Sequence, residues 1–197
     1  MRSFGRDIIS LARAYSPNII KKQEQIDLIG KLDLHIQLFL DHYTGLKITG
    51  IQGTTQKKVL NKLKPIFEKM ARGEQEYDIN EIAKEIEKTY NGFKGYRSKA
   101  IARTEAHFLA NDGELQAAKY TEVIKQKEWI TSVRPASRGY DPSDGTDHIA
   151  MNGVKVAKDD KFEVPSVDGF DLMDCPGDYS APPDQVINCT CVMGFSK

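Results

Sequence analysis

The chain has 197 residues, 40% of them apolar, and it carries 28 basic and 28 acidic side chains. This composition is that of an ordinary folded protein and excludes a disordered or collagen-like chain. No apolar run approaches the roughly 18 residues that cross a bilayer, so we expect no membrane partner. The charged opening residues do not resemble a signal peptide, and three cysteines are too few for a disulfide scaffold. A reducing cytoplasm is therefore the expected compartment.

The balanced net charge conceals two unlike parts of the chain. Residues 129–197 carry 6 basic and 11 acidic side chains, which leaves 22 basic and 17 acidic side chains in residues 1–128. A modest basic excess suits an acidic partner on the first part, either nucleic acid or protein. The alternative is that the two parts are solvated surfaces that attract each other.

Apolar side chains recur at helical spacing over residues 1–128, which predicts a helical first part. A Ser-Pro-Asn sequence ends the first helix, and glycines at 45, 50 and 53 mark a loop after the second. The predicted helices cover residues 8–15, 26–40, 54–71, 79–90 and 95–126.

Three local features shape these helices. Asp78 and Glu81 form a capping box before the fourth helix, which the Asn-Gly pair at 91–92 ends. Pro65 lies inside the third helix and should kink or restart it. An Asn-Asp-Gly sequence at 111–113 weakens the last helical region, so that either one helix or two are expected there.

The amino-acid composition of the chain changes at residue 129. The remaining residues hold six of the eight prolines, and loops rich in Asp, Gly, Ser and Pro separate short β-prone runs. The predicted strands cover residues 129–133, 154–156, 162–164 and 186–193. We expect an α+β fold in which an N-terminal helical region precedes a small, loop-rich, β-containing domain packed on the last long helix.

The cysteines of this second part suggest a metal site. Cys189 and Cys191 stand two residues apart, and in a strand both would face the same side. Cys175 and His148 lie upstream in predicted loops. Three thiolates and one imidazole satisfy a tetrahedral zinc site, and a loop-rich unit with few large apolar side chains gains stability from such a metal. The alternative is three reduced, half-buried thiols and a surface histidine.

Signals for catalysis are sparse. Asp147 and His148 could act as an orienting carboxylate and a general base, although sequence neighbours rarely face each other. No nucleophile elbow, zinc-protease motif, phosphate-binding loop or dinucleotide fingerprint occurs. Asp141 and Asp144 do not match a calcium loop, and with Asp147 they are expected to be solvated loop carboxylates.

Structural or surface roles explain the charged residues on the helices more simply than catalysis does. Glu105 lies among apolar neighbours, and we expect it to pair with a nearby arginine such as Arg103 and to anchor the last helix to the β unit. Lysines at 21–22, 57–58, 62 and 64 could contact DNA phosphates, and a solvated helix face explains each of them individually.

Several short segments within residues 95–193 occur in a distinctive order. This ordered set resembles the phage minor head protein family, also called the Mu F-like head morphogenesis domain. That family shows an "ARTE" helix, a tryptophan, an "H…G" step and a closing "PGD…P…NC-x-C". The matching residues here are Arg103, Glu105, Trp129, His148, Gly153, Pro176, Gly177, Asp178, Asn188, Cys189 and Cys191.

Two departures from the family pattern affect the predicted site. The interval between Trp129 and His148 holds a loop rich in Asp, Gly and Ser, which suggests an insertion. Cys175 stands where the family commonly has an aromatic or aliphatic residue. The resemblance therefore implies His148, Cys189 and Cys191 as ligands and leaves a fourth ligand unassigned.

The resemblance implies a minor capsid protein of a tailed phage or prophage that associates with the portal and acts in head assembly and genome packaging or delivery. It places the protein in the virion interior, after assembly in the bacterial host cytoplasm. Expected partners are the portal, capsid or scaffold protein, and DNA through the basic helices. The implied organisation is a helical arm over residues 1–94 and the family domain over residues 95–197.

The resemblance also implies a protein that is not an enzyme and requires no cofactor, with structural zinc as the one candidate. Two alternatives remain. One is a nuclease-like or toxin-related enzyme that uses Glu105, Asp147 and His148. The other is a non-specific DNA-binding protein.

Overall fold

The structure is a computed structural model, and it describes residues 22–42, 53–72, 74–89, 93, 95–131, 133–134 and 137–197. Several predictions lie outside these residues: the helix at 8–15, the loop at 43–52, the side chains of Lys21 and Lys22, and the helix end at 91–92. None of the described helices combines the length and the hydropathy that a bilayer-spanning segment requires.

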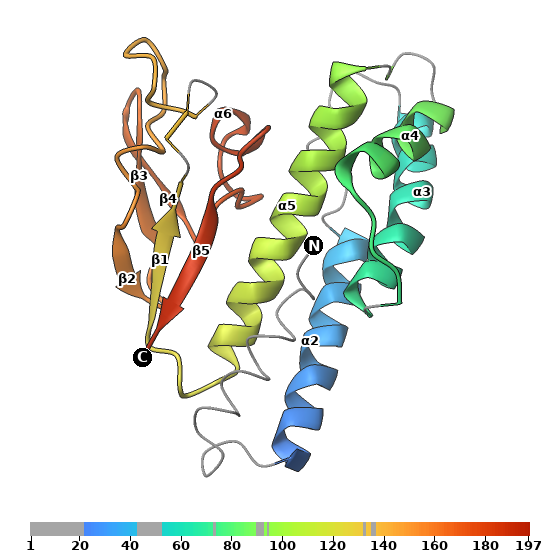
Figure 1. The fold of residues 1–197 in the computed structure, drawn as a ribbon, viewed down its shortest axis with the longest axis horizontal. Coiled ribbons are helices and arrows are strands. Elements are labelled where there is room, and N and C mark those ends of the chain that lie inside the picture. The colour runs from blue at the N-terminus through green and yellow to red at the C-terminus, as the bar shows by residue number, and fades with distance from the viewer. Residues whose placement is uncertain are drawn as a thin grey trace.

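Helices make up one side and the centre of the described part of the molecule. Helices α2 (Lys22–His42), α3 (Gly53–Ala71) and α4 (Ile79–Thr89) pack together, and α2 and α4 contact α5 (Tyr96–Lys119). Figure 1 shows these three helices on one side of α5 and the strands on the other. Helix α3 continues through Pro65 as a single element, so of the two predicted outcomes at this proline the restart is wrong and the kink stays a prediction.

Helix α4 begins with the predicted capping box. The Asp78 carboxylate accepts hydrogen bonds from the backbone N–H groups of Asn80 and Glu81 at 2.7 and 2.9 Å. The Glu81 carboxylate accepts one from the backbone N–H of Asp78 at 2.8 Å. These reciprocal bonds satisfy donors that have no partner inside the helix, which fixes where the helix starts.

Helix α5 is a single uninterrupted helix and lies at the centre of the fold. The weak segment at 111–113 does not break it, because tertiary contacts bind its polar side chains. Asn111 donates to two backbone carbonyls of the β unit, and His35 of α2 lies 2.7 Å from the Asp112 carboxylate. The helix is buried on several faces because both layers cover it.

The β unit contains two small antiparallel sheets. Strand β1 (Gln126–Ile130) is the centre of the first sheet, between β2 (Lys155–Ala157) and β5 (Val192–Ser196). Strands β3 (Phe162–Ser166) and β4 (Gly169–Met173) form a separate hairpin. The α+β class with an N-terminal helical region is thus confirmed.

The strand predictions need three corrections. The first strand lies three residues earlier than predicted, at 126–130, and β4 was not predicted because Gly169 and Asp171 mask its alternation. The predicted strand at 186–193 is mostly wrong, because only residues 192 and 193 belong to a strand, β5. Residue 186 ends the short helix α6 (Pro183–Val186), which begins at a proline suited to a first helical turn, and a loop separates α6 from β5.

A single hydrophobic core joins both sides of α5. The side chains of Leu32, Phe67 and Ile86 on the helical side and of Trp129 and Met193 in the sheet belong to one cluster of buried residues. Trp129 and Met193 are also cross-strand partners in the register of β1 and β5. The described part of the predicted arm therefore packs on α5 and does not project away from it.

Candidate metal centre

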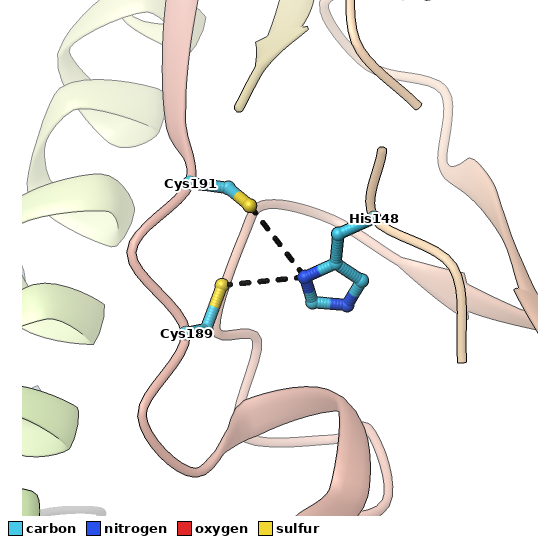
Figure 2. A group of neighbouring side chains, drawn as sticks. All are labelled: His148, Cys189 and Cys191. Atoms are coloured by element: carbon cyan, nitrogen blue, oxygen red, sulfur yellow. Dashed lines mark hydrogen bonds between the residues drawn. The ribbon is translucent and has the colours of Figure 1, made fainter. Parts of the chain in front are cut away.

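Three of the predicted residues meet in the interior of the β unit. The Nδ1 atom of His148 lies 3.7 Å from Cys189 Sγ and 3.5 Å from Cys191 Sγ. Figure 2 shows both thiols directed at the same ring nitrogen. The three candidate ligand atoms lie within 4.8 Å of one another, and the three residues are only 1 to 3% exposed.

The cysteines reach this position from a loop and not from a strand. Asn188, just before Cys189, has a φ of 60°, a left-handed conformation that asparagine tolerates better than most residues. Its backbone N–H donates to the Thr104 hydroxyl at 3.1 Å, and its side-chain oxygen accepts from Arg103 at 3.0 Å. Helix α5 thereby holds the loop at the turn where both thiols face His148.

Hydrogen bonds around Gln185 decide which nitrogen of His148 is free to bind a ligand. The Gln185 amide N–H₂ donates to the Pro165 carbonyl at 3.1 Å and to the Asp171 carboxylate at 2.9 Å. Its oxygen therefore faces His148 Nε2, 2.7 Å away, and accepts a hydrogen bond from it. The imidazole then carries its hydrogen on Nε2 and directs the Nδ1 lone pair toward the two thiols.

The two thiols differ in acidity. A hydrogen bond from the Cys189 thiol lowers the pKa of Cys191 to about 4, and the Thr131 hydroxyl adds to this effect against the cost of burial. The pKa of Cys189 is raised well above its usual value because its thiol donates that hydrogen bond and because it is buried. A metal ion bound between the two sulfurs would displace the protons that they carry as thiols.

The geometry fits a tetrahedral metal ion. A zinc ion bound at about 2.3 Å to sulfur and about 2.1 Å to nitrogen places these donors about 3.6 Å apart. The observed nitrogen–sulfur distances of 3.5 and 3.7 Å lie on either side of that value. The cluster of His148, Cys189 and Cys191 could thus bind a metal ion.

Cys175 does not belong to this group, so the predicted Cys₃His set needs correction. It lines a different cavity of about 270 Å³, together with Asp112 of α5 and Asp178. Burial, aided by these two carboxylates, raises the pKa of the Cys175 thiol. The proline that follows Cys175 begins a separate turn, and this turn carries the thiol toward α5 rather than toward His148.

Asp147, which was weighed as a catalytic partner of His148, has another hydrogen-bond partner. The Asp147 carboxylate accepts from the backbone N–H of Ala150 at 2.9 Å, while Gln185 is the residue that orients His148. Glu105 is buried in α5 and is not among the potential metal ligands grouped around His148. Asp141 accepts from Ser143, and this bond lowers the pKa of Asp141.

Three more residues that the sequence singled out, Gly153, Gly177 and Asp178, shape turns of the β unit. Gly153 and Gly177 have φ angles of 84° and 79°, which a glycine adopts without strain. The N–H of Gly153 donates to the Trp129 carbonyl at 2.8 Å. Asp178 caps the turn that contains Gly177 by accepting from the backbone of Asp174 and Ser180 at 2.7 and 2.8 Å.

Helix α5 is tied to this turn as well as to the cysteine loop. Asn111 donates to the carbonyls of Pro176 and Cys191 at 2.9 and 3.1 Å. Arg103, through Asn188, and Asn111 thus anchor α5 to the β unit, while the pairing predicted for Glu105 stays a prediction.

Sequence reasoning missed the residues that support the ligands. Gln185 is fully buried and orients the imidazole, and the Thr131 hydroxyl lies 3.1 Å from Cys191 Sγ. Trp129, which the sequence had already singled out, packs edge-on against the His148 ring, with 5.2 Å between ring centroids. Glutamine and threonine are common surface residues, and only the short spacing between Gln185 and Cys189 hinted at a role near the site.

The basic side chains proposed to contact DNA lie on α3. Lys57, Lys58 and Lys62 are exposed there, and Lys64 forms an ion pair with Asp41 of α2. This arrangement is equally that of a solvated helix face.

Comparisons with protein-family models, with curated proteins and with solved structures gave no match to this chain.

Proposed function

We propose that this protein is a structural component of a phage head, of the minor head family that its motif residues resemble, and that a zinc ion braces its C-terminal unit. The observation that supports this proposal is the convergence of the motif residues on one junction. Arg103 binds Asn188, Asn111 binds the Pro176 and Cys191 carbonyls, and Trp129 packs on His148. Residues far apart in the sequence thus maintain a shape, as expected of a docking protein.

Zinc is the metal that this donor set favours. Two thiolates and a neutral imidazole are soft and intermediate ligands, which suit zinc better than magnesium or calcium. The His148 imidazole donates from Nε2 to a buried side chain, as ligating histidines usually do. The ion would join the loop that carries Cys189 and Cys191 to the separate loop that carries His148. That link would stabilise a unit whose strands have no more than five residues each.

The zinc proposal is tested by metal content. The full chain, purified without chelator and analysed by elemental mass spectrometry, should contain about one zinc per chain. A double Cys189→Ser, Cys191→Ser variant should lose it, and Cys175→Ser is the matched control that should retain it. Equal zinc in the unchanged chain and the double variant would contradict the proposal.

The proposed role in the head is tested by co-purification. The chain should associate with the portal protein encoded in the same genome, and it should be found in procapsids and virions. Capsid or scaffold protein and DNA are further candidate partners, to be sought in the same preparations. Absence of the chain from both procapsids and virions would rule out this role.

A further inference from the structure

The metal centre has three protein donors, and a tetrahedral ion takes four. Within the part of the chain that the structure describes, no fourth histidine, cysteine or carboxylate joins the group of His148, Cys189 and Cys191. The remaining cysteine, Cys175, lines a separate cavity with Asp112 and Asp178. These facts direct attention to what else surrounds the cluster.

His107, another histidine near the cluster, has other hydrogen-bond partners. His107 hydrogen-bonds to the backbone of Cys191, and its Nε2 lies 3.0 Å from the Asn111 amide nitrogen. It thus supports the cysteine loop from the α5 side. Its position on the backbone of a ligand makes it a neighbour of the site and not a donor to the metal.

Two polar groups border the cluster without being metal ligands themselves. The Thr131 hydroxyl lies 3.1 Å from Cys191 Sγ, and a neutral hydroxyl is a weak zinc ligand but a good hydrogen-bond partner for a small molecule bound to the metal. The indole N–H of Trp129, whose ring contacts that of His148, is buried and has no hydrogen-bond partner among the described residues. Buried donors usually have an acceptor, and none of the described residues supplies one to this N–H group.

Burial limits what the fourth ligand can be. The three donor residues are 1 to 3% exposed, so a side chain of a partner protein cannot reach the ion without opening the unit. A ligand of one to three atoms suits such a buried position better. The cavity of about 420 Å³ on the α5 side is lined by Thr190, between the two cysteines, and by none of the three donor residues.

We propose that the fourth ligand comes from outside the chain: a small monodentate ligand that binds through oxygen or nitrogen, water in plain buffer, held beside Thr131. This inference rests on the zinc site proposed above. It makes the centre a binding site for small anions such as azide, in place of a site closed by four protein ligands.

The sulfur count at the metal provides the first test. X-ray absorption spectroscopy on the zinc-loaded full chain should show two sulfur and two light-atom neighbours, with a single imidazole among the latter. Cys175→Ser should give the same spectrum. Three sulfurs, or two imidazoles, would overturn the inference while leaving the zinc site itself intact, whereas a chain without bound zinc would overturn both.

Exchange of the fourth ligand provides the second test. In the cobalt-loaded chain, azide should shift the visible absorption bands in a saturable way. Thr131→Val should retain the metal but weaken azide binding about 5-fold, the effect of one lost hydrogen bond, and Thr131→Ser should restore it. Glu163→Gln, at an exposed carboxylate of β3, is the control and should behave as the unchanged chain. Cobalt bands that do not respond to azide, or an azide affinity that Thr131→Val leaves unchanged, would overturn the inference.

Discussion

Replacement of Gln185 by methionine should destabilise the β unit and weaken metal binding together. The glutamine side chain is completely buried and makes three hydrogen bonds, to His148, Pro165 and Asp171, at 2.7, 3.1 and 2.9 Å. Methionine has a similar length and fills the space without polar atoms. All three partners would therefore lose their hydrogen bonds to this side chain.

The expected loss in free energy of unfolding depends on how well each partner can form a hydrogen bond to water instead. Pro165 and Asp171 are only half-buried, so each should lose about 0.5 kcal/mol, whereas the N–H of His148, in a residue 1% exposed, keeps the full penalty of about 2 kcal/mol. The expected loss in free energy of unfolding is thus about 3 kcal/mol. The imidazole also loses the bond that fixes its tautomer, so zinc affinity should fall by about 10- to 100-fold.

Urea unfolding of the zinc-loaded chain measures the first effect, and competition with a chromophoric chelator measures the second. Gln126→Met is the matched control, because Gln126 is exposed in β1 and its replacement should change stability by less than about 0.5 kcal/mol. If Gln185→Met matched this control in both assays, the role assigned to the buried amide would be wrong.

Three further predictions concern other parts of the fold. Asp78→Ala should lower the free energy of unfolding in urea by about 1 kcal/mol, because the helix cap is lost. Asn80→Ala leaves that cap in place and should cause no such loss. Equal losses in the two variants would contradict the capping assignment. Gly177→Ala should lower the free energy of unfolding by about 1 kcal/mol, because a φ of 79° strains any side chain. Gly30→Ala, in the open middle of α2, should raise it by up to about 1 kcal/mol. Two changes of the same sign would refute this contrast. Burial lowers the pKa of His107, so the unfolded chain takes up its proton first as the pH falls below about 6.5, and the folded state loses stability there. The unfolding free energy of the unchanged chain minus that of His107→Gln should therefore decrease between pH 7.5 and 5.5, and a constant difference would show that burial of His107 has no such effect.

Local sequence patterns predicted the helices well, because the signals that make a helix are themselves local. Asp78 and Glu81 mark the start of α4 by bonds within one turn. The strands were harder to predict. The pairing of β1 with β5 joins segments more than sixty residues apart, and residues 186–190 have β-prone side chains that the prolines before them and the contact with α5 hold in a helical turn and a loop.

The metal ligands show the same contrast between what local sequence predicts and what long-range contacts decide. The sequence alone determined which side chains could bind a soft metal, because cysteine and histidine chemistry is a property of the residue. Only the tertiary structure decided that His148 joins Cys189 and Cys191 while Cys175 does not. The physical reason is that Asn188, Arg103 and Thr104 set the direction of the cysteine loop through contacts between residues more than eighty positions apart, which no local pattern encodes.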